Sequence, residues 1–471
     1  MKNARTFVSA ILLTAFSLSM FACGKKETDS KKHLRDLAPE VREKIKSIAE
    51  NEELLTGELE NKTVKWLSDW DINPDSTGKN VPIDLAVFQE RYGGKIEFHQ
   101  VTYENRYEKL AESINSGDGV DFFYAGNLDA FPKGAVRGIF EPVDKYIDFS
   151  SPLWEDVQEV NDGAMWNNQH YLAIIRATGD QCAVIYNRKT IKEAGLEDPA
   201  DLYERGEWDW DAFQSMLETF VDTDNQRYGL DGWFFEFGLM NTTGVPPVGM
   251  ENGKLVNNLG DYSMERVQNL LYDLYDNDCI AIGVGDYGWT EKPEYIGEGK
   301  SIFYPCGLYK FYSSPDQWKA TFGEDAFFVP MPKDPEADEY YIPTGLEAYV
   351  MVKGGQNPEG VAKYLDCKRY VLLNDELCSM GDQQMTDDYG WTEEMMKMKE
   401  SMQELADANP VIDYSRGVSS DCGELLDNNL RNSARGTQWN ETYDSISPVV
   451  DEYISEVNAG ECPDDTEEKD E

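Results

Sequence analysis

The stretch Lys95–Tyr124, KIEFHQVTYENRYEKLAESINSGDGVDFFY, predicts a strand, a helix and a second strand in close succession. Lys95–Thr102 predicts the first strand, and Arg106–Asn115 predicts the helix that follows it. Val120–Tyr124 is a short, nearly continuous apolar run, as in a strand that is buried on both faces. Strand–helix–strand repetition at this spacing favours a mainly parallel sheet with helices on both sides.

The same alternation continues in both directions along the chain. Upstream, Thr63–Leu67 predicts a strand, and a helix is expected from about Pro82 to Tyr92. Downstream, the predicted elements are strands at Tyr171–Ile175 and Cys182–Tyr186, helices at Asp211–Phe220 and Met264–Asp276, and a helix-rich region from Pro358 onward. The predicted fold class is therefore α/β.

The composition is that of a folded protein with a strongly acidic surface. The chain has 471 residues, of which 41% are hydrophobic and 12% aromatic, and its formal net charge is -46. A length of this size is about three domains' worth of material. A field this negative repels phosphate backbones and anionic lipid, which argues against nucleic acid or a membrane surface as the main partner. Neutral and cationic small ligands remain open.

The N-terminus has the pattern of a targeting segment. Lys2 and Arg5 precede an apolar run from Phe7 to Ala22, which is short for a membrane span but fits a signal peptide. The run ends directly before Cys23, and this arrangement resembles the lipobox of bacterial lipoproteins, in which the cysteine is lipidated. An ordinary secretory signal followed by a chance cysteine is the alternative. We expect residues 1–22 to be a lipoprotein signal peptide and Cys23 to carry the lipid.

Polar segments flank the predicted fold. Residues 23–61 are rich in lysine and glutamate and are expected to form a polar tether that contains a short amphipathic helix. Residues 459–471 are expected to form an acidic tail. Seven further cysteines are widely and irregularly spaced, which favours buried thiols, with one or two disulfides left open.

Several short motifs, in order along the chain, resemble those of family 1 of the bacterial extracellular solute-binding proteins, the carbohydrate-capturing lipoproteins of ABC importers. No single motif is specific, and the resemblance over roughly residues 62–455 depends on their order together with the lipobox. The motifs are VIYNR at Val184–Arg188, followed by Ala194-Gly195-Leu196 and Asp198-Pro199; WDWDAF at Trp208–Phe213; GKSIF at Gly299–Phe303; VPMPK at Val329–Lys333; and Asn357-Pro358-Glu359 at the start of a helix.

The resemblance implies a two-lobed, periplasmic-binding-protein-like fold with a hinge and a helix-rich C-terminal part. Lobe one is then expected to comprise residues 62–177 and about 300–350, and lobe two residues 178–299. Residues 351–458 are expected to be helices that contact both lobes. A hinge at Ala177–Gly179 is plausible because the sequence ATGD supplies small residues there.

The implied function is that of an extracellular substrate-binding protein, lipid-anchored on the outer face of the bacterial cytoplasmic membrane. Such a protein captures a carbohydrate, with an oligosaccharide favoured, and delivers it to the transmembrane permease subunits of an ABC importer. We expect a monomer that needs no cofactor, reaches the membrane only through its lipid anchor and does not bind nucleic acid. A secreted carbohydrate-active hydrolase and a non-transport surface sensor or adhesin on the same fold are the alternatives.

The short motifs that resemble phosphate-binding, metal-binding or catalytic sites are incomplete or uninformative. Gly299-Lys300-Ser301 lacks the upstream glycine of a phosphate-binding loop, since Glu294 stands there. Asp222–Gln226 resembles the start of a calcium loop but has Arg227 at the position that requires glycine. With 89 carboxylates, a pair at glycosidase spacing is uninformative. We therefore predict no catalytic residues and no metal site.

Ligands of doubly wound folds gather at the carboxyl ends of strands, so ligand contacts are expected there. Sugars need aromatic faces and planar polar groups. For each candidate, a packed aromatic or a solvated charge is the alternative. The candidates are Asp69, Trp70, Tyr124, Asn127, Arg176 and Glu347 in lobe one or on a crossing strand, Trp233 and Glu236 in lobe two, and Tyr309 after the turn FYPCG.

Overall fold

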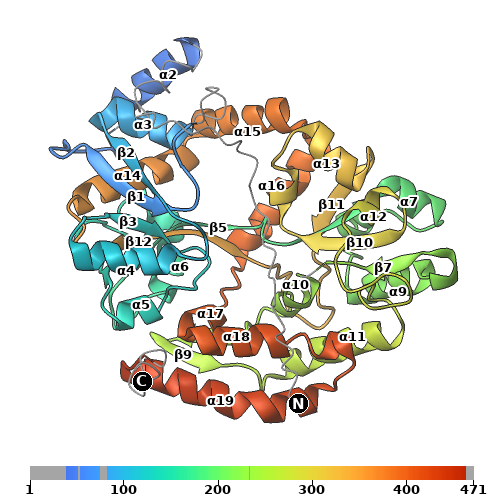
Figure 1. The fold of residues 1–471 in the computed structure, drawn as a ribbon. Helices are drawn as coiled ribbons and strands as arrows, with labels where there is room; N and C mark the ends of the chain where they lie inside the picture. Colours follow the sequence, from blue (N-terminus) through green and yellow to red (C-terminus); the bar gives the residue numbers. More distant parts are fainter. Residues whose placement is uncertain (1–38, 51–52, 75–81, 233, 463–471) are drawn as a thin grey trace, which may run out of the picture.

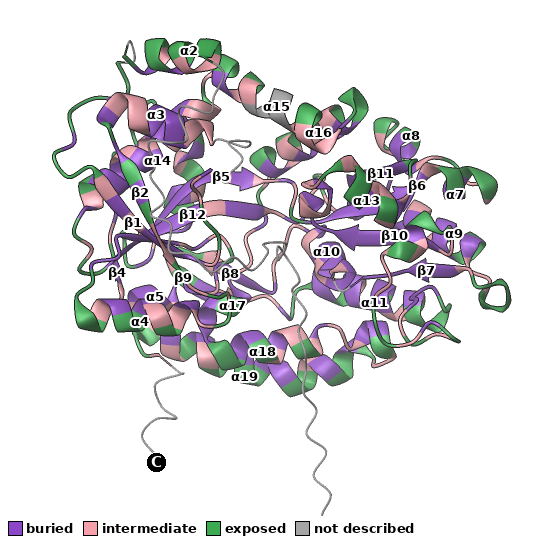
Figure 2. Ribbon diagram, turned by 45° about the horizontal axis from the view of Figure 1, so that its top comes forward, coloured by how far each residue is buried: buried purple, intermediate pink, exposed green. Residues whose placement is uncertain are grey.

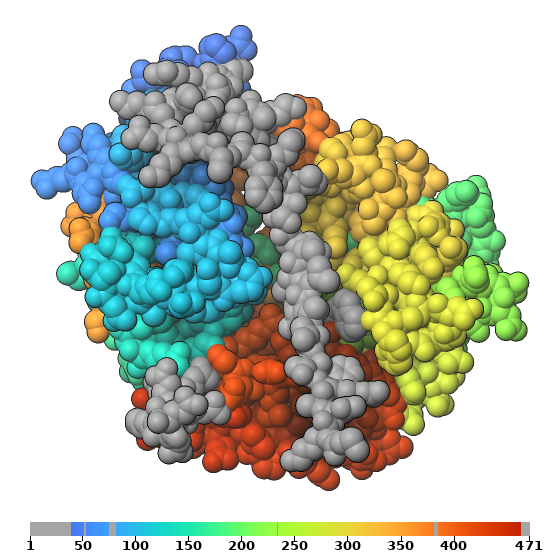
Figure 3. Space-filling view, viewed as in Figure 1, coloured from blue at the N-terminus to red at the C-terminus, as the bar shows by residue number. Residues whose placement is uncertain are grey.

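The computed structural model describes residues 39–50, 53–74, 82–232 and 234–462. Two α/β lobes lie side by side, and the last helices, residues 415–459, lie below both of them (Figure 1). The space-filling view shows the blue and cyan atoms of lobe one and the yellow and green atoms of lobe two as separate masses (Figure 3). The predicted signal peptide, Cys23 and Trp233 lie outside the described residues.

Lobe one is built on a six-stranded sheet. β1 is parallel to β2 and β3, whereas β12 is antiparallel to β3, β4 and β5. The strands lie in the order β2-β1-β3-β12-β4, and β5 pairs with β12 off this path. They are β1 (Thr63–Ser68), β2 (Lys95–Gln100), β3 (Phe122–Tyr124), β4 (Phe140–Glu141), β5 (Leu172–Thr178) and β12 (Gly345–Val352).

Lobe two is built on a four-stranded sheet in the order β11-β6-β10-β7. β6 is antiparallel to β10 and β11, and β7 is parallel to β10. A separate hairpin, β8–β9, turns at Asn252-Gly253, where both residues have positive φ. The strands are β6 (Ala183–Asn187), β7 (Tyr228–Leu230), β8 (Val248–Glu251), β9 (Lys254–Asn257), β10 (Ser301–Cys306) and β11 (Ala326–Pro330).

Helices cover both sheets, and Figure 2 shows their exposed faces in green over strands that are largely purple. The α-helices of lobe one are α2 (Pro39–Glu50), α3 (Ile83–Tyr92), α4 (Arg106–Ser116), α5 (Lys133–Val136), α6 (Gln158–Gly163), α14 (Pro358–Leu372) and α15 (Asp375–Tyr389). Those of lobe two are α7 (Arg188–Glu193), α8 (Pro199–Glu204), α9 (Trp210–Phe220), α10 (Phe235–Asn241), α11 (Tyr262–Asp276), α12 (Glu294–Gly297) and α13 (Pro315–Phe322). The C-terminal group is α16 (Glu393–Ala408), α17 (Ser415–Val418), α18 (Ser420–Asn429) and α19 (Trp439–Ala459). Within the described residues, no helix combines the length and apolarity needed to cross a membrane.

Three connections join the lobes. The first runs from β5 to β6 through residues 179–182, the second from β11 to β12 through residues 331–344, and the third from α15 to α16. Figure 1 shows β5 crossing the middle of the molecule. The C-terminal helices touch both sides: α16 packs on β5 and β11, and Tyr414, just before α17, contacts Phe131 of lobe one with ring centroids 6.3 Å apart. Free thiols at Cys182, Cys279, Cys306 and Cys367 are buried.

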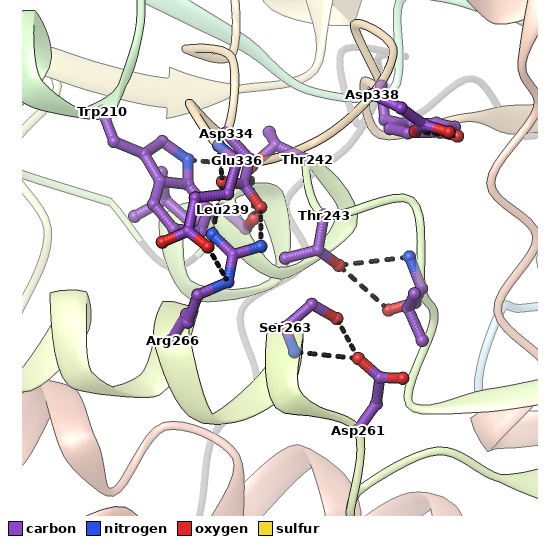
Figure 4. Close-up of polar contacts among 12 residues, drawn as sticks. Trp210, Leu239, Thr242, Thr243, Asp261, Ser263, Arg266, Asp334, Glu336 and Asp338 are labelled. Carbon is purple, nitrogen blue, oxygen red and sulfur yellow. Dashed lines mark hydrogen bonds and ion pairs between the residues drawn. The ribbon is translucent and has the colours of Figure 1, made fainter.

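An ion pair fixes the second connection to lobe two (Figure 4). Arg266 of α11 donates two hydrogen bonds of 2.6 Å to Asp334, which has no accessible surface. Arg266 also lies 5.5 Å from the ring of Trp210 and 3.8 Å from Glu336. A bidentate ion pair whose carboxylate is fully buried is costly to break, so the start of this connection is held to lobe two.

The structure corrects the expected return of the chain to lobe one near residue 300. β10 and β11 pair with β6, so residues 301–306 and 326–330 belong to the sheet of lobe two. The chain returns only with β12. A short apolar strand can pair in either sheet, so the sequence pattern alone could not assign these strands to one of the two lobes.

The structure also shortens the expected tether of residues 23–61. Ile45 and Ala49 of α2 have no accessible surface, and Leu55 is equally buried. Arg91 of α3 donates hydrogen bonds to the carbonyls of Leu55 (2.7 Å) and Gly57 (3.1 Å). Of the expected tether, residues 39–50 and 53–61 are therefore part of lobe one.

Candidate ligand-binding face between the lobes

The carboxyl ends of β1, β3 and β5 meet at one edge of the first sheet. This follows because β3 and β5 are both antiparallel to β12, and β3 is parallel to β1. β5 enters the first connection from this edge, so the edge faces lobe two. We call the candidate side chains along it the interlobe face of lobe one: Asp69, Trp70, Tyr124, Asn127, Arg176 and Glu347.

Trp70 is the exposed aromatic of this face. Trp70 lies in the loop that follows β1, and 41% of its surface is accessible. Its ring meets Tyr124 edge to face at 5.0 Å and Trp66 at 5.6 Å, and the indole N–H of Trp66 donates to the carbonyl of Trp70 at 3.2 Å. Trp66 itself is fully buried. The core tryptophan thus holds an exposed one in place, and the accessible part of the Trp70 indole can accept an apolar surface.

Tyr124 is fixed by the neighbouring strand. Its hydroxyl donates to the carbonyl of Leu346 at 2.9 Å, and its ring lies 5.9 Å from Tyr349. Burial raises its pKa well above the ordinary value, and the charge of Glu347 acts in the same direction. The hydroxyl therefore stays protonated, and the aromatic and charged parts of the face are joined through this residue.

Arg176 and Glu347 form the charged part of the interlobe face. Arg176 Nε lies 3.2 Å from one carboxylate oxygen of Glu347, and Lys368 Nζ lies 2.8 Å from the other. Lys368 also pairs with Asp84 at 2.7 Å. A register shift in β12 directly after Glu347 changes the alternation of its side chains at this point. Burial acts to raise the pKa of Glu347, but Lys368 and Arg176 outweigh it and lower the pKa to about 2.

The Arg176 side chain is partly enclosed by protein and partly accessible to solvent. Burial acts against its charge, while Glu347 and Asp180 raise its pKa above the ordinary value. Yet 38% of its side-chain surface is accessible to solvent. The accessible part of the Arg176 side chain can exchange its water for ligand hydroxyls.

The first connection is packed tightly against neighbouring elements. Asp180 accepts a hydrogen bond from the hydroxyl of Tyr312 at 2.7 Å, and its carbonyl accepts one from the amide of Leu308 at 3.0 Å. A Cβ on Gly179 would overlap the carbonyl of Met402 in α16. The side-chain amide of Gln403 donates to the carbonyl of Ala177 at 2.8 Å. The hinge predicted at Ala177–Gly179 is therefore a point where the backbone has little free space.

The sheet of lobe two presents its carboxyl edge to the same connection. β7 and β10 are parallel, and Leu308, just after β10, is the residue that bonds to Asp180. Tyr309 lies here, half-buried, and its hydroxyl accepts a hydrogen bond from the thiol of Cys306 at 3.4 Å. Asp231, just after β7, is fully buried, and burial raises its pKa to about 6.

The structure differs from the prediction for Glu236. This residue lies in the first turn of α10 with only 3% of its surface accessible, so it offers no surface to a ligand. Among the described residues, its Oε2 atom has no hydrogen-bond partner. Burial raises its pKa to about 7, although Arg431 and Arg435 act in the opposite direction.

Of the other candidates, Asp69 is half-buried and Asn127 is exposed, and both follow strands that end at the interlobe face. Four residues were not predicted from the sequence: Lys368 and Asp84, which complete the charged network, and Asp180 and Tyr312, which hold the first connection. Asp180 directly follows the glycine of the predicted hinge, a signal that could have identified it. Lys368 and Asp84 lie on helices α14 and α3, and no local pattern marks them.

This arrangement suits the binding of a neutral, hydroxyl-rich molecule. An exposed indole provides a stacking surface, and the paired Arg176 and Glu347 provide oriented donors and acceptors without a net local charge. Across the described residues, no group of three or more metal-ligating side chains was found. A surface hollow elsewhere on lobe two is lined by Glu218, Asp222, Asp224 and Asp278 and offers no aromatic face.

Comparison with known proteins gives one family match and a common fold. The sequence profile of the family "bacterial extracellular solute-binding protein" matches residues 73–367. No curated protein matches the chain in sequence.

Solved structures of sugar-binding proteins share the fold. A cyclo/maltodextrin-binding protein complexed with maltotetraose is 14% identical, covering 85% of this chain and 99% of that chain, with a TM-score of 0.59. A cyclic α-maltosyl-1,6-maltose-binding protein from Arthrobacter globiformis is 14% identical, covering 83% and 98%, with a TM-score of 0.58. A substrate-binding protein from Listeria monocytogenes in complex with cycloalternan is 12% identical, covering 84% and 99%, with a TM-score of 0.56.

Proposed function

Because the chain belongs to the bacterial extracellular solute-binding protein family, we propose that it captures a carbohydrate between its two lobes and delivers it to the permease of an ABC importer. An oligosaccharide is the favoured ligand, since the neighbours in fold were solved with maltotetraose and cycloalternan. A ligand that touches both lobes binds the closed arrangement better, and only that difference can shift the protein toward closure. The closed arrangement is then the signal that the permease reads.

The observation that carries the proposal is the interlobe face of lobe one. Trp70 exposes 41% of its surface there, held by the buried Trp66 and by Tyr124. Arg176 and Glu347 follow on the same edge as a fixed polar pair. An aromatic ring can stack on the apolar C–H face of a pyranose, and the oriented polar groups beside it can bind the hydroxyls at the edge of the sugar ring. We propose Asp69, Trp70, Tyr124, Asn127, Arg176, Tyr309 and Glu347 as ligand contacts; Trp233 stays a prediction.

A thermal-shift screen of the purified protein tests the proposal. We expect maltotetraose, cycloalternan or β-1,6-galactobiose, each the ligand of a neighbour in fold, to raise the unfolding temperature progressively with concentration. A free ligand at 100 times its Kd adds about 2.7 kcal/mol to the free energy of unfolding. Recovery of the sugar unchanged distinguishes binding from hydrolysis. If amino acids or peptides stabilise the protein while all saccharides fail, the carbohydrate assignment is wrong.

Trp70→Ala is expected to weaken carbohydrate binding by about 1–3 kcal/mol, or roughly 5- to 150-fold in Kd. The physical reason is the loss of the exposed stacking surface. Isothermal titration with the stabilising saccharide measures the change, and circular dichroism checks the fold. Tyr275→Ala is the matched control, since Tyr275 of α11 is similarly exposed at 44%. Equal losses in both variants would remove Trp70 from the proposed site.

We also propose that Cys23 is lipidated and anchors the protein to the outer face of the cytoplasmic membrane. The support is the short apolar run that ends in Ala22-Cys23 behind Lys2 and Arg5. Labelled palmitate should enter the wild type and be absent from Cys23→Ala, which should leave the membrane fraction. A Cys23→Ala protein that still takes up label and stays on membranes would contradict the lipoprotein assignment.

A further inference from the structure

The loop 282–293 leaves the sheet of lobe two at its interlobe edge. Ile280 forms a parallel bridge with Leu230 at the end of β7, and the amide of Ala281 donates to the carbonyl of Leu230 at 2.7 Å. The chain at residues 280–281 therefore runs in the same direction as β7 and β10. Because the carboxyl ends of β7 and β10 face the first connection, the loop begins on the side that faces lobe one.

The base of this loop is fixed by buried polar contacts. Tyr287 has only 1% of its surface accessible, and its hydroxyl accepts a hydrogen bond from the amide of Lys292 at 3.0 Å. The same amide donates to the buried carboxylate of Asp231 at 2.9 Å. Glu291 accepts a hydrogen bond from the hydroxyl of Tyr304 on β10 at 2.9 Å. These contacts join the loop to the ends of β7 and β10, so its position relative to the sheet is determined.

Trp289 projects from this fixed base. Its exposed fraction is 79%, and none of the other large apolar side chains in the described part of the chain exceeds it. The ring lies over Gly283: a Cβ at that position would be 2.9 Å from two ring carbons, and Gly283 has φ +85°. An isolated exposed apolar side chain is common on protein surfaces. Trp289 differs from such isolated side chains because it packs on Gly283 near the interlobe edge, in a loop that buried hydrogen bonds hold in place.

We propose that Trp289 is the aromatic platform of lobe two, which stacks on a pyranose ring of the bound carbohydrate when the lobes close. This inference rests on the proposed function and extends it to a residue outside the sequence-predicted site. Trp70 and Trp289 then stand on opposite lobes, each with an accessible indole ring at the interlobe edge. A saccharide long enough to contact both gains stacking energy only in the closed arrangement, so Trp289 couples ligand length to closure.

Three variants test the inference with the saccharide that stabilises the wild type most among maltotetraose, cycloalternan and β-1,6-galactobiose. Trp289→Ala is expected to weaken binding at least about fivefold. Trp289→Phe, which keeps a smaller ring, should lie between Ala and wild type. Tyr262→Ala is the matched control: Tyr262 of α11 is 66% exposed and does not belong to the loop, so its loss should leave Kd within about twofold.

Acrylamide quenching gives an independent readout. Wild-type fluorescence should lose a quenchable component when the saccharide saturates the protein, and Trp289→Phe should show a smaller change, because only Trp70 then remains to be protected. If Trp289→Ala binds within twofold of wild type, or if the saccharide changes quenching as much in Trp289→Phe as in the wild type, the inference is wrong while the proposed function stands. If none of the three saccharides binds the wild type, both fail. The unfolding temperatures of all three variants should match that of the wild type, because the Trp289 and Tyr262 side chains are largely exposed.

Discussion

Replacing Lys368 by methionine is expected to lower the free energy of unfolding by about 3 kcal/mol. Lys368 lies between the carboxylates of Asp84 (2.7 Å) and Glu347 (2.8 Å), and only 14% of its side-chain surface is accessible. Removing Lys368 leaves Asp84 without its ion-pair partner and leaves Glu347 with Arg176 alone; breaking a buried ion pair costs about 3–5 kcal/mol. The lower end applies because Asp84 and Glu347 keep 14% and 22% of their side-chain surfaces accessible to water.

Urea denaturation at pH 7 measures this change. The control is Lys397→Met on α16, where the pair with Glu393 is 2.9 Å long but the lysine side chain is 70% exposed. That variant should show almost no change in the free energy of unfolding, because a largely exposed ion pair contributes little to stability. A Lys368→Met protein that matches the control would show that the network contributes nothing to stability. The low pKa of Glu347 should rise in the variant, because Lys368 is the largest influence that lowers it.

Glu236→Gln is expected to stabilise the protein increasingly as the pH rises from 4.5 to 8. Burial raises the folded-state pKa of Glu236 from 4.5 to about 7. Between these values the folded protein holds a proton that the unfolded chain has already released, so the free energy of unfolding of the wild type falls with rising pH. One pKa unit corresponds to about 1.4 kcal/mol, so the whole effect is on the order of 3 kcal/mol.

The measured quantity is the difference in unfolding free energy between wild type and variant at each pH. Taking the difference removes the contribution of Asp231, whose raised pKa affects both proteins equally. Exposed Glu251→Gln on β8 is the control and should show no trend. A constant difference between pH 5 and pH 8 would mean that Glu236 is not held in its buried, unpaired position.

The sequence predicted the alternating elements well because their apolar periods are local. Arg106–Asn115 was predicted as a helix and α4 spans Arg106–Ser116. Asp211–Phe220 became α9, which starts one residue earlier at Trp210. The hairpin β8–β9 was not predicted, although Asn252-Gly253 is a strong local signal for one.

Sheet membership and burial could not be predicted, because both depend on partners that are distant in sequence. β10 and β11 pair with β6, more than a hundred residues earlier in the chain. Glu236 follows β7 closely enough to be a ligand candidate, yet α10 turns it into the protein. Trp66 and Trp70 are four residues apart, and only the packing of β1 makes one a core residue and the other an exposed one.

The packing of α2 and Leu55 onto lobe one sets how far the protein can travel from its anchor. With the lipid at Cys23, as proposed, the chain between the membrane and Pro39 comprises residues 24–38, which is 38 − 23 = 15 residues. Fully extended, such a chain reaches about 50 Å. A tether of that length would confine the protein to a thin layer at the membrane that also holds the permease, so that it would not diffuse away from its partner. An encounter that is far too weak to detect between free proteins in solution is then strong enough to deliver cargo.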